Sequence, residues 1–538
     1  MISIRRGGVH NNAPSRSFIR DSASSIEKNV VIRSLSTTRP PKPLRQWRKE
    51  TKQHHSRANL RHFSNSTNTS PALTRHSQAV AQISLNVRQF FERKEKFRIN
   101  HGSTNSTRNN AKGKNIINIG GLSHVLEVNT ATQTAWVEPN VPMDRLVEET
   151  LKYGLVPPVV MEFPGITAGG GYAGTSGESS SFRHGFFNET INRVEMILAD
   201  GQVIQCSKTE NPDLFHGAAG AVGSMGVTTL VELKLQKARK YVETTYHPVS
   251  DMPNAIQKIE EMTADPSIDY VDGIMFSKKK GAIIVGRLTD TPTDNTPVQR
   301  FGSASDPWFY MHVESSIDKD SNSKSPPRFA IPLAEYLFRY DRGAFWVGAS
   351  AFKYFSFPFN RFTRWFLDDF LHTRMLYTAL HTAGMPPGAT PTMHPHSASY
   401  EADGQTLKPL MNIGLWGYGK EKDLVKANIS LEKKLKELGG MKWLYAQTYY
   451  NEEQFWEMYD RKWYDELRNK YRATGLPSVY EKVRAAPKTE VAKPLSLSEK
   501  FLKAWPISGF HGIYKAIQSK TYLAARASAW KTIEIGKK

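Results

Sequence analysis

The pattern of apolar and polar positions predicts short strands and helices from about residue 79 onward. Apolar residues cluster or alternate with polar ones at 97–100, 116–119 and 134–138, as expected for half-buried strands. Further strands are predicted at 194–198, 203–206 and 227–235. Both strands and helices are therefore predicted along the chain.

Two local patterns define a helix and a hairpin. Leu146, Val147 and Leu151 recur at helical spacing, so a helix is predicted with Asn140 as its cap, Pro142 in its first turn and Gly154 just past its end.

The Asp200-Gly201 pair, between two predicted strands, predicts a hairpin with a type I′ turn. A short helix is predicted at 212–219, followed by a glycine-rich loop at 220–226.

Residues 1–78 form a predicted disordered, basic N-terminal segment. The first 80 residues contribute +12 of the formal net charge of +21, so the rest of the chain is only mildly basic. Two interpretations are open, a solvated tail and a mitochondrial presequence around 33–39. No basic patch with interleaved aromatic residues is evident, which argues against nucleic-acid binding.

The single cysteine, Cys206, excludes an intrachain disulfide and indicates a reducing environment. The chain has neither a CxxC nor an HExxH pattern, so no protein-ligated metal is predicted.

The most distinctive stretch is 164–185, PGITAGGGYAGTSGESSSFRHG. Glycine lets a backbone turn through positive φ and approach a ligand closely, and successive N–H groups in such turns hold anionic oxygens. The stretch therefore predicts a site for a pyrophosphate-bearing cofactor; a flexible glycine-serine linker is the alternative. The glycines do not open a helix directly after a first strand, so the Rossmann-type dinucleotide fold is not predicted.

Several segments carry a family resemblance. The stretch Gly169–Gly177, followed by Leu198-Ala-Asp-Gly201 and by 213–227, resembles the FAD-binding domain of the vanillyl-alcohol oxidase and p-cresol methylhydroxylase (PCMH) type. Glu453-Gln-Phe-Trp-Glu-Met-Tyr459, Phe345-Trp346 and further segments across residues 80–485 resemble the Δ24-sterol reductases of the seladin and Diminuto/Dwarf kind.

The resemblance implies an α+β fold, with a two-lobed PCMH-type FAD-binding domain at 79–240 and an α+β substrate (cap) domain at 241–486. The tail at 487–538 is basic and amphipathic, which predicts either a peripheral membrane helix or a solvated C-terminal helix. The resemblance also implies non-covalent FAD, with NADPH as electron donor. Three segments and one histidine would bind FAD: His101, Gly102, Ser103 and Thr104; Thr167, Ala168, Gly169, Gly170, Gly171, Tyr172, Ala173, Gly174, Thr175, Ser176, Gly177, Glu178 and Ser179; Gly223, Gly226 and Val227; and His184.

The implied reaction is reduction of the C24=C25 side-chain double bond of a sterol. An isolated alkene accepts hydride only if a positioned acid supplies a proton. The candidate proton donors are Glu178, Tyr449 and Tyr450, each with a structural alternative: holding the loop for Glu178, core packing for the tyrosines. His394 and His396 are further candidates, with a loop that has no catalytic role as the alternative.

Aromatic residues with interleaved Lys353, Arg361, Arg364 and Arg374 fill the stretch 345–374. They predict either a lipid-facing or sterol-lining surface or an ordinary core. The resemblance implies a membrane-associated enzyme of the endoplasmic reticulum, with mitochondrion or cytoplasm as alternatives. The functional alternatives are an FAD-dependent oxidase acting on a sugar acid or phenol, and a non-catalytic lipid-binding relative.

Overall fold

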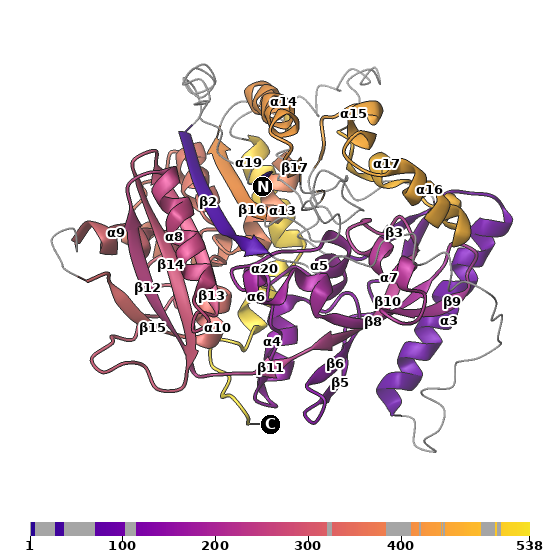
Figure 1. Cartoon of the computed structure of the whole chain (residues 1–538), viewed down its shortest axis with the longest axis horizontal. Coiled ribbons are helices and arrows are strands. Elements are labelled where there is room, and N and C mark those ends of the chain that lie inside the picture. Colours follow the sequence, from indigo (N-terminus) through magenta and orange to yellow (C-terminus); the bar gives the residue numbers. More distant parts are fainter. Residues whose placement is uncertain are drawn as a thin grey trace.

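The computed structural model describes residues 2–5, 27–36, 70–102, 115–319, 325–383, 410–418, 421–442, 444, 447–485, 501–502 and 507–537 (Figure 1). The fold is α+β, as predicted, and is built on two large antiparallel sheets. Among these residues no helix is both long and apolar enough to cross a bilayer.

The first sheet has five strands. Its order is β5 (Val125–Asn129), β6 (Thr134–Val137), β10 (Val227–Lys234), β8 (Ile191–Ile197) and β9 (Val203–Ser207). A parallel pair, β3 (Arg98–Asn100) and β4 (Ile116–Asn118), and a short pair, β7 (Leu155–Val156) and β11 (Gln236–Lys237), accompany it. The helices of this part are α3 (Pro71–Glu92), α4 (Met143–Leu151), α5 (Ala168–Gly174), α6 (Ser181–His184), the 3-10 helix η1 (Phe187–Thr190) and α7 (Pro212–Ala218).

The predicted helix and hairpin both form, with two corrections. Pro142 is the N-cap of α4, while the Asn140 side chain donates a hydrogen bond to Ile119 O. In the β8–β9 hairpin Gly201 has φ +86°, but Asp200 does not have positive φ. A type I′ turn requires positive φ at both central residues, so that prediction is wrong. Gly201 N–H bonds to Leu198 O instead, the geometry of a type I turn followed by a left-handed glycine.

The second sheet has eight strands. Its order is β15 (Arg328–Pro332), β12 (Tyr241–Val249), β14 (Lys280–Thr289), β13 (Tyr270–Ser277), β2 (Glu27–Ser36), β16 (Leu410–Tyr418), β1 (Ile2–Arg5) and β17 (Met441–Lys442). Helices α8 (Met252–Ala264) and α9 (Phe309–Lys319) pack against it. Figure 1 shows the two sheets side by side, with this one to the left.

The N-terminal segment differs from the prediction of disorder over 1–78. Strand β2 lies between β13 and β16, β1 pairs with β16 and β17, and helix α3 begins at Pro71. The run Val30-Val-Ile32 is rich in β-branched residues, which suit a strand, but its partners lie more than 200 residues away. Sequence periodicity does not reveal such distant pairing.

The remaining helices pack mainly in the second part of the molecule, which is built on the eight-stranded sheet. Some of them also contact the first part, which is built on the five-stranded sheet. The remaining helices are α10 (Leu333–Leu337), α11 (Val347–Phe355), α12 (Arg361–Phe366), η2 (Asp368–Phe370), α13 (Thr373–Ala383), α14 (Glu421–Glu437), α15 (Glu452–Trp456), α16 (Arg461–Lys470), η4 (Ala473–Gly475), α17 (Val479–Val483), α19 (Ile507–Gln518) and α20 (Thr521–Ala527). Leu467 of α16 packs against Gly217 of α7, and α17 contacts the first part through Lys482. One buried hydrophobic cluster, which includes Val137 and Ile284, extends over both sheets.

Candidate functional site

The structure links the three predicted cofactor segments through a chain of hydrogen bonds that passes through Ile119, Pro139 and Asn140. Asn100, beside the first segment, accepts from Ile119 N–H at 2.9 Å, and Ile119 O accepts from the Asn140 amide. The neighbouring Pro139 O accepts from Gly169 N–H at 2.7 Å, and Ala173 O accepts from Val222 N–H at 3.2 Å. The three segments are far apart in sequence and meet beside the five-stranded sheet.

The glycine-rich stretch forms helix α5 rather than an open turn. The Thr167 hydroxyl caps the helix by accepting from Gly170 N–H at 3.2 Å. Ala168 N–H donates to Val141 O, and Gly171 N–H donates to Thr167 O. The predicted row of peptide N–H groups open to a ligand is therefore wrong for 168–171, because these donors bond within the protein.

Three glycines in this stretch are required by packing. A Cβ on Gly169 would lie 2.7 Å from Pro139, one on Gly171 would lie 2.5 Å from Met161, and one on Gly177 would lie 2.8 Å from Phe186. Gly170 differs, because it is exposed and its nearest neighbour is the Thr167 hydroxyl at 3.1 Å. Among the three consecutive glycines, Gly170 is the one that permits close approach of a ligand to the backbone.

The first and third segments each present a left-handed glycine. Gly102 has φ +71° and no atom near the position of a Cβ, and Gly223 has φ +72° beside Ile99. His101 is half-buried, whereas Ser103 and Thr104 lie outside the described residues. Gly226 packs against Ile197 O, and Val227 is buried at the start of β10.

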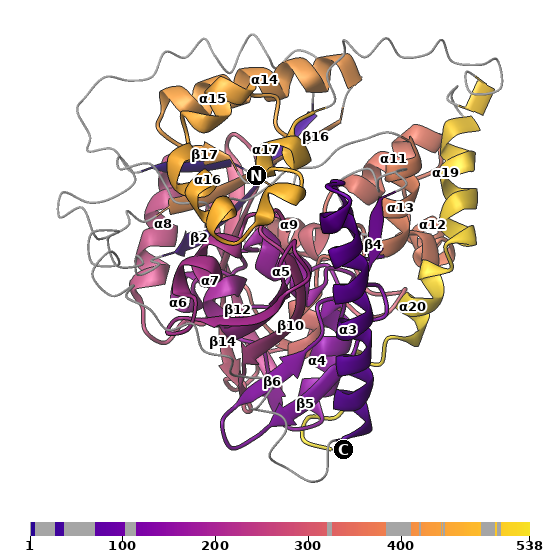
Figure 2. The ribbon, with the colours of Figure 1, turned by 90° about the vertical axis from the view of Figure 1, so that its right-hand side faces the viewer.

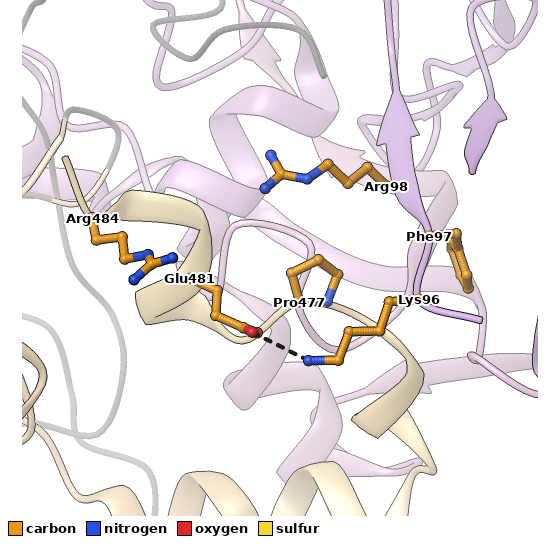
Figure 3. Close-up of a pocket in the computed structure, with 6 residues that line it drawn as sticks. All are labelled: Lys96, Phe97, Arg98, Pro477, Glu481 and Arg484. Atoms are coloured by element: carbon orange, nitrogen blue, oxygen red, sulfur yellow. Dashed lines mark hydrogen bonds and ion pairs between the residues drawn. The ribbon is translucent and has the colours of Figure 1, made fainter. Parts of the chain in front are cut away.

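A pocket of 260 Å³ adjoins these segments where β3 meets α17 (Figure 3). Its walls are formed by Lys96, Phe97, Arg98, Pro477, Glu481 and Arg484. Lys96 pairs with Glu481 at 3.2 Å, while Arg98 and Arg484 extend from opposite walls. On the same helix, Lys482 donates to Val222 O and Gly223 O, both at 2.9 Å. A lining with three cations suits an anionic group such as a phosphate rather than an apolar ligand.

These features fit FAD. Exposed Gly170 and open Gly102 leave backbone accessible on two of the three segments, and cations lie next to the first. Close approach to the backbone and nearby cationic side chains each favour the binding of a diphosphate.

The glycine-serine segment ends at the eight-stranded sheet. Val271 N–H of β13 donates to Ser179 O at 2.8 Å, and the Ser179 hydroxyl lies 3.5 Å from the Arg339 guanidinium. Glu178 is buried at this junction, and its N–H donates to the Ser181 hydroxyl. Thr175, with φ 46°, and half-buried Ser176 lead into it from α5.

Arg339 is a buried cation that sequence reasoning missed. It pairs with Asp272 at 2.9 Å, and Tyr340 donates to the same carboxylate at 2.7 Å. Burial opposes its charge, but nearby phenols and Asp272 raise the pKa of Arg339 above its usual range. The guanidinium also lies 4.2 Å from the Tyr336 ring centroid. The only signal in the sequence was an arginine within an aromatic run, Phe338-Arg-Tyr340.

Comparison with known proteins now decides the class of this site. The FAD binding domain family matches residues 71–207, which include α5 and its surroundings. The Δ(24)-sterol reductases of Macaca fascicularis and Homo sapiens are each 28% identical over 398 residues, covering 67% of this chain and 76% of theirs. The Δ(24)-sterol reductase of Arabidopsis thaliana is 25% identical over 438 residues, covering 70% of this chain and 77% of its own. Cytokinin dehydrogenase 9 of Oryza sativa is 27% identical over 270 residues, 48% of this chain and 51% of its own.

The protein is an FAD-dependent oxidoreductase of the Δ24-sterol reductase type. The resemblance stated from the sequence is confirmed, and so is its FAD-binding class.

Within this oxidoreductase the three candidate proton donors lie in different surroundings. Glu178 lies on the segment from which the site is built. Tyr450 donates its phenol proton to Glu432 O of α14 at 2.6 Å, and burial followed by the Glu432 charge raises the pKa of Tyr450. Tyr449 donates its N–H to the Glu432 carboxylate, with Lys442 5.6 Å from its ring centroid. The structure therefore ties both tyrosines to α14.

Of the remaining histidine candidates, only His184 lies among the described residues. His184 is half-buried at the end of α6, and burial, followed by the Arg183 charge, lowers its pKa, so it is neutral at pH 7. His394 and His396 lie outside the described residues.

Proposed function

We propose that this oxidoreductase reduces the C24=C25 side-chain double bond of a sterol, with FAD as cofactor and NADPH as electron donor. The observation that carries the proposal is that three sequence-distant segments are linked by hydrogen bonds, and that the segment with exposed Gly170 lies within the region that matches the FAD binding domain family. The names of the relatives support a sterol as substrate.

In this proposal the part built on the five-stranded sheet is a two-lobed PCMH-type FAD-binding domain, and the eight-stranded sheet belongs to the substrate cap. Gly102, Gly170 and Gly223 hold the diphosphate region, assisted by Arg98 and Arg484. Ser179, beside the Arg339–Asp272 pair, lies where the two parts meet. Bound FAD supplies hydride chemistry that amino-acid side chains lack.

The protein itself must supply the proton. An isolated alkene develops positive charge at its more substituted carbon when it is protonated, so the acid must be held near that carbon. Glu178 is the candidate that the geometry favours, because it is buried at the junction of the two parts. By resemblance we place the enzyme at membranes of the endoplasmic reticulum.

Incubation of the purified protein with desmosterol and NADPH, followed by mass spectrometry of the extracted sterol, tests the proposal. The expected product is the saturated side chain, two hydrogens heavier, and it should not form without NADPH. Unchanged desmosterol would contradict the proposal.

The match to a cytokinin dehydrogenase makes an oxidase of the same superfamily the second candidate. Such an oxidase would act on a sugar acid or phenol, and NADPH would not bleach its flavin under anaerobic conditions. A non-catalytic lipid-binding relative would be colourless and would bind sterol unchanged.

A further inference from the structure

Helix α19 is packed with its small residues inward. Gly509, Gly512 and Ala516 are the buried residues of this helix. A Cβ on Gly509 would lie 2.5 Å from Tyr354, and one on Gly512 would lie 2.8 Å from Ala379 O of α13. The two helices therefore pack closely through small side chains, a mode of helix packing that is enriched in membrane proteins.

The large apolar side chains of α19 point outward. Phe510, Tyr514 and Ile517 are 55%, 55% and 42% exposed. Their spacing of four and three residues forms a continuous stripe on one helix face. A water-facing helix has the opposite arrangement, with its large apolar residues in the core.

Helix α12 and its flanks form a second exposed apolar segment. None of the residues in α12 is buried. Phe362, Trp365 and Phe366 are 66%, 52% and 69% exposed. In contrast, Phe345 and Phe352, from the same aromatic stretch, are core residues, so the stretch combines the two predicted alternatives.

The two segments lie on one side of the molecule. The ring of Phe355, the last residue of α11, packs against the ring of Phe510 of α19 in a tilted arrangement, with centroids 5.4 Å apart. An ion pair between Arg526 of α20 and Asp369 of η2 joins the residues that follow α19 to those that follow α12. Figure 2 shows α11, α12, α13, α19 and α20 together on the right-hand side.

Positive charge surrounds this apolar surface. Exposed or half-exposed cations lie at Lys353, Arg361, Arg364, Lys515 and Lys520. The two acids of segments 350–370 and 507–523, Asp368 and Asp369, are paired with arginines. Arg374, predicted to join these cations, is instead buried in a pair with Asp144.

We propose that α12 and α19 together form a docking surface that inserts its aromatic side chains into the headgroup region of an anionic bilayer. Outward Phe and Trp side chains with interleaved Arg and Lys are the composition of helices that lie in the interface plane. Exposed apolar area of this kind is uncommon on monomeric soluble proteins. The surface is independent of the proposed reaction, because bilayer binding requires neither flavin nor substrate turnover.

Sedimentation of the full chain with vesicles tests the proposal. Binding is expected to phosphatidylcholine vesicles containing phosphatidylserine, and weaker binding to phosphatidylcholine alone. Phe362→Ser and Phe510→Ser are each expected to weaken binding roughly tenfold, because each removes an inserted aromatic side chain. Arg361→Glu with Lys515→Glu is expected to remove the preference for phosphatidylserine. Val298→Ser, which alters a 56% exposed residue outside these two helices, is the matched control and should bind like the parent.

Three outcomes would overturn the inference. The parent protein could fail to sediment with either vesicle, or the two serine variants could bind as well as the parent. Alternatively, analytical ultracentrifugation could show a dimer that Phe362→Ser and Phe510→Ser dissociate, in which case a second copy of the chain covers the surface. Equal flavin content and circular dichroism in parent and variants would show that the comparison is made between folded proteins.

Discussion

Arg374 donates two hydrogen bonds to Asp144, at 2.5 and 2.9 Å, and so ties α13 to the first turn of α4. Both side chains are buried. The Ser528 hydroxyl, near the C-terminus, donates to the same carboxylate at 2.6 Å. One carboxylate thus fixes three segments of the chain, two of them predicted as parts of other domains.

Removal of Arg374 should therefore destabilise the whole protein. Arg374→Ala leaves Asp144 buried without its main partner, and we expect a loss of about 3 to 5 kcal/mol in the free energy of unfolding. The control is Arg239→Ala, which breaks the exposed pair with Asp290 and should cost at most about 1 kcal/mol. Urea denaturation measures both. If Arg374→Ala lost as little free energy of unfolding as Arg239→Ala, the Arg374–Asp144 pair would not be what joins the two parts.

Two buried histidines should make stability depend on alkaline pH. Burial lowers the pKa of His372, but Asp341 and Asp368 outweigh burial and raise it to about 9; Glu138 and Glu195 likewise raise the pKa of His76 to about 9. Each folded-state pKa lies above the ordinary value of 6.5, so this stabilisation is complete below pH 6.5 and is lost as pH rises toward 9.

We expect each histidine to contribute about 2 to 3 kcal/mol of this change, measured by urea denaturation across the same pH window. His372→Gln should reduce the change in the free energy of unfolding between pH 6.5 and 9 by the amount that His372 contributes. A parent protein whose stability is constant from pH 6.5 to 9 would contradict the assignment of these two pairs.

Gly170→Val should remove the cofactor without unfolding the protein. The new side chain would occupy the exposed position where the ligand approaches the backbone, whereas its nearest protein neighbour is only the Thr167 hydroxyl. Flavin absorbance per protein should fall while circular dichroism is unchanged. Gly121→Val, at a glycine with no atom near its Cβ position, should retain flavin. Gly171→Val should instead unfold the protein, because its Cβ would meet Met161 and Phe187. A yellow Gly170→Val protein would show that FAD does not approach this glycine.

Substitutions of the candidate acids should distinguish a residue that donates the proton from one that only stabilises the fold. Glu178→Gln should slow sterol reduction by about 10²-fold or more while NADPH still bleaches the flavin at the parent rate. Tyr450→Phe loses the hydrogen bond to Glu432 O and should cost about 1 kcal/mol of stability with little change in turnover. Stopped-flow absorbance and sterol analysis measure the two steps. A large loss of turnover in Tyr450→Phe alone would reverse the assignment.

Local patterns predicted the elements whose partners lie nearby. The spacing of Leu146, Val147 and Leu151 is enough to define α4, and the turn at Gly201 is enough to define the β8–β9 hairpin. The turn type was wrong because sequence does not fix the φ of Asp200, and β2 was missed because its partner strands are distant.

The candidate site was predictable only in part. Resemblance identified the three segments, but Gly169 and Gly171 of α5 are explained by contacts with Pro139 and Met161, which sequence spacing does not reveal. The Arg339–Asp272 pair was missed because its two residues lie 67 positions apart and neither stands in a recognisable motif.

The anaerobic absorbance spectrum of the purified protein tests the central claim most directly. The account predicts a two-banded oxidised flavin spectrum that NADPH bleaches and that desmosterol restores in the absence of oxygen. A colourless protein that does not take up added FAD, or a bleached flavin that only oxygen restores, would contradict it.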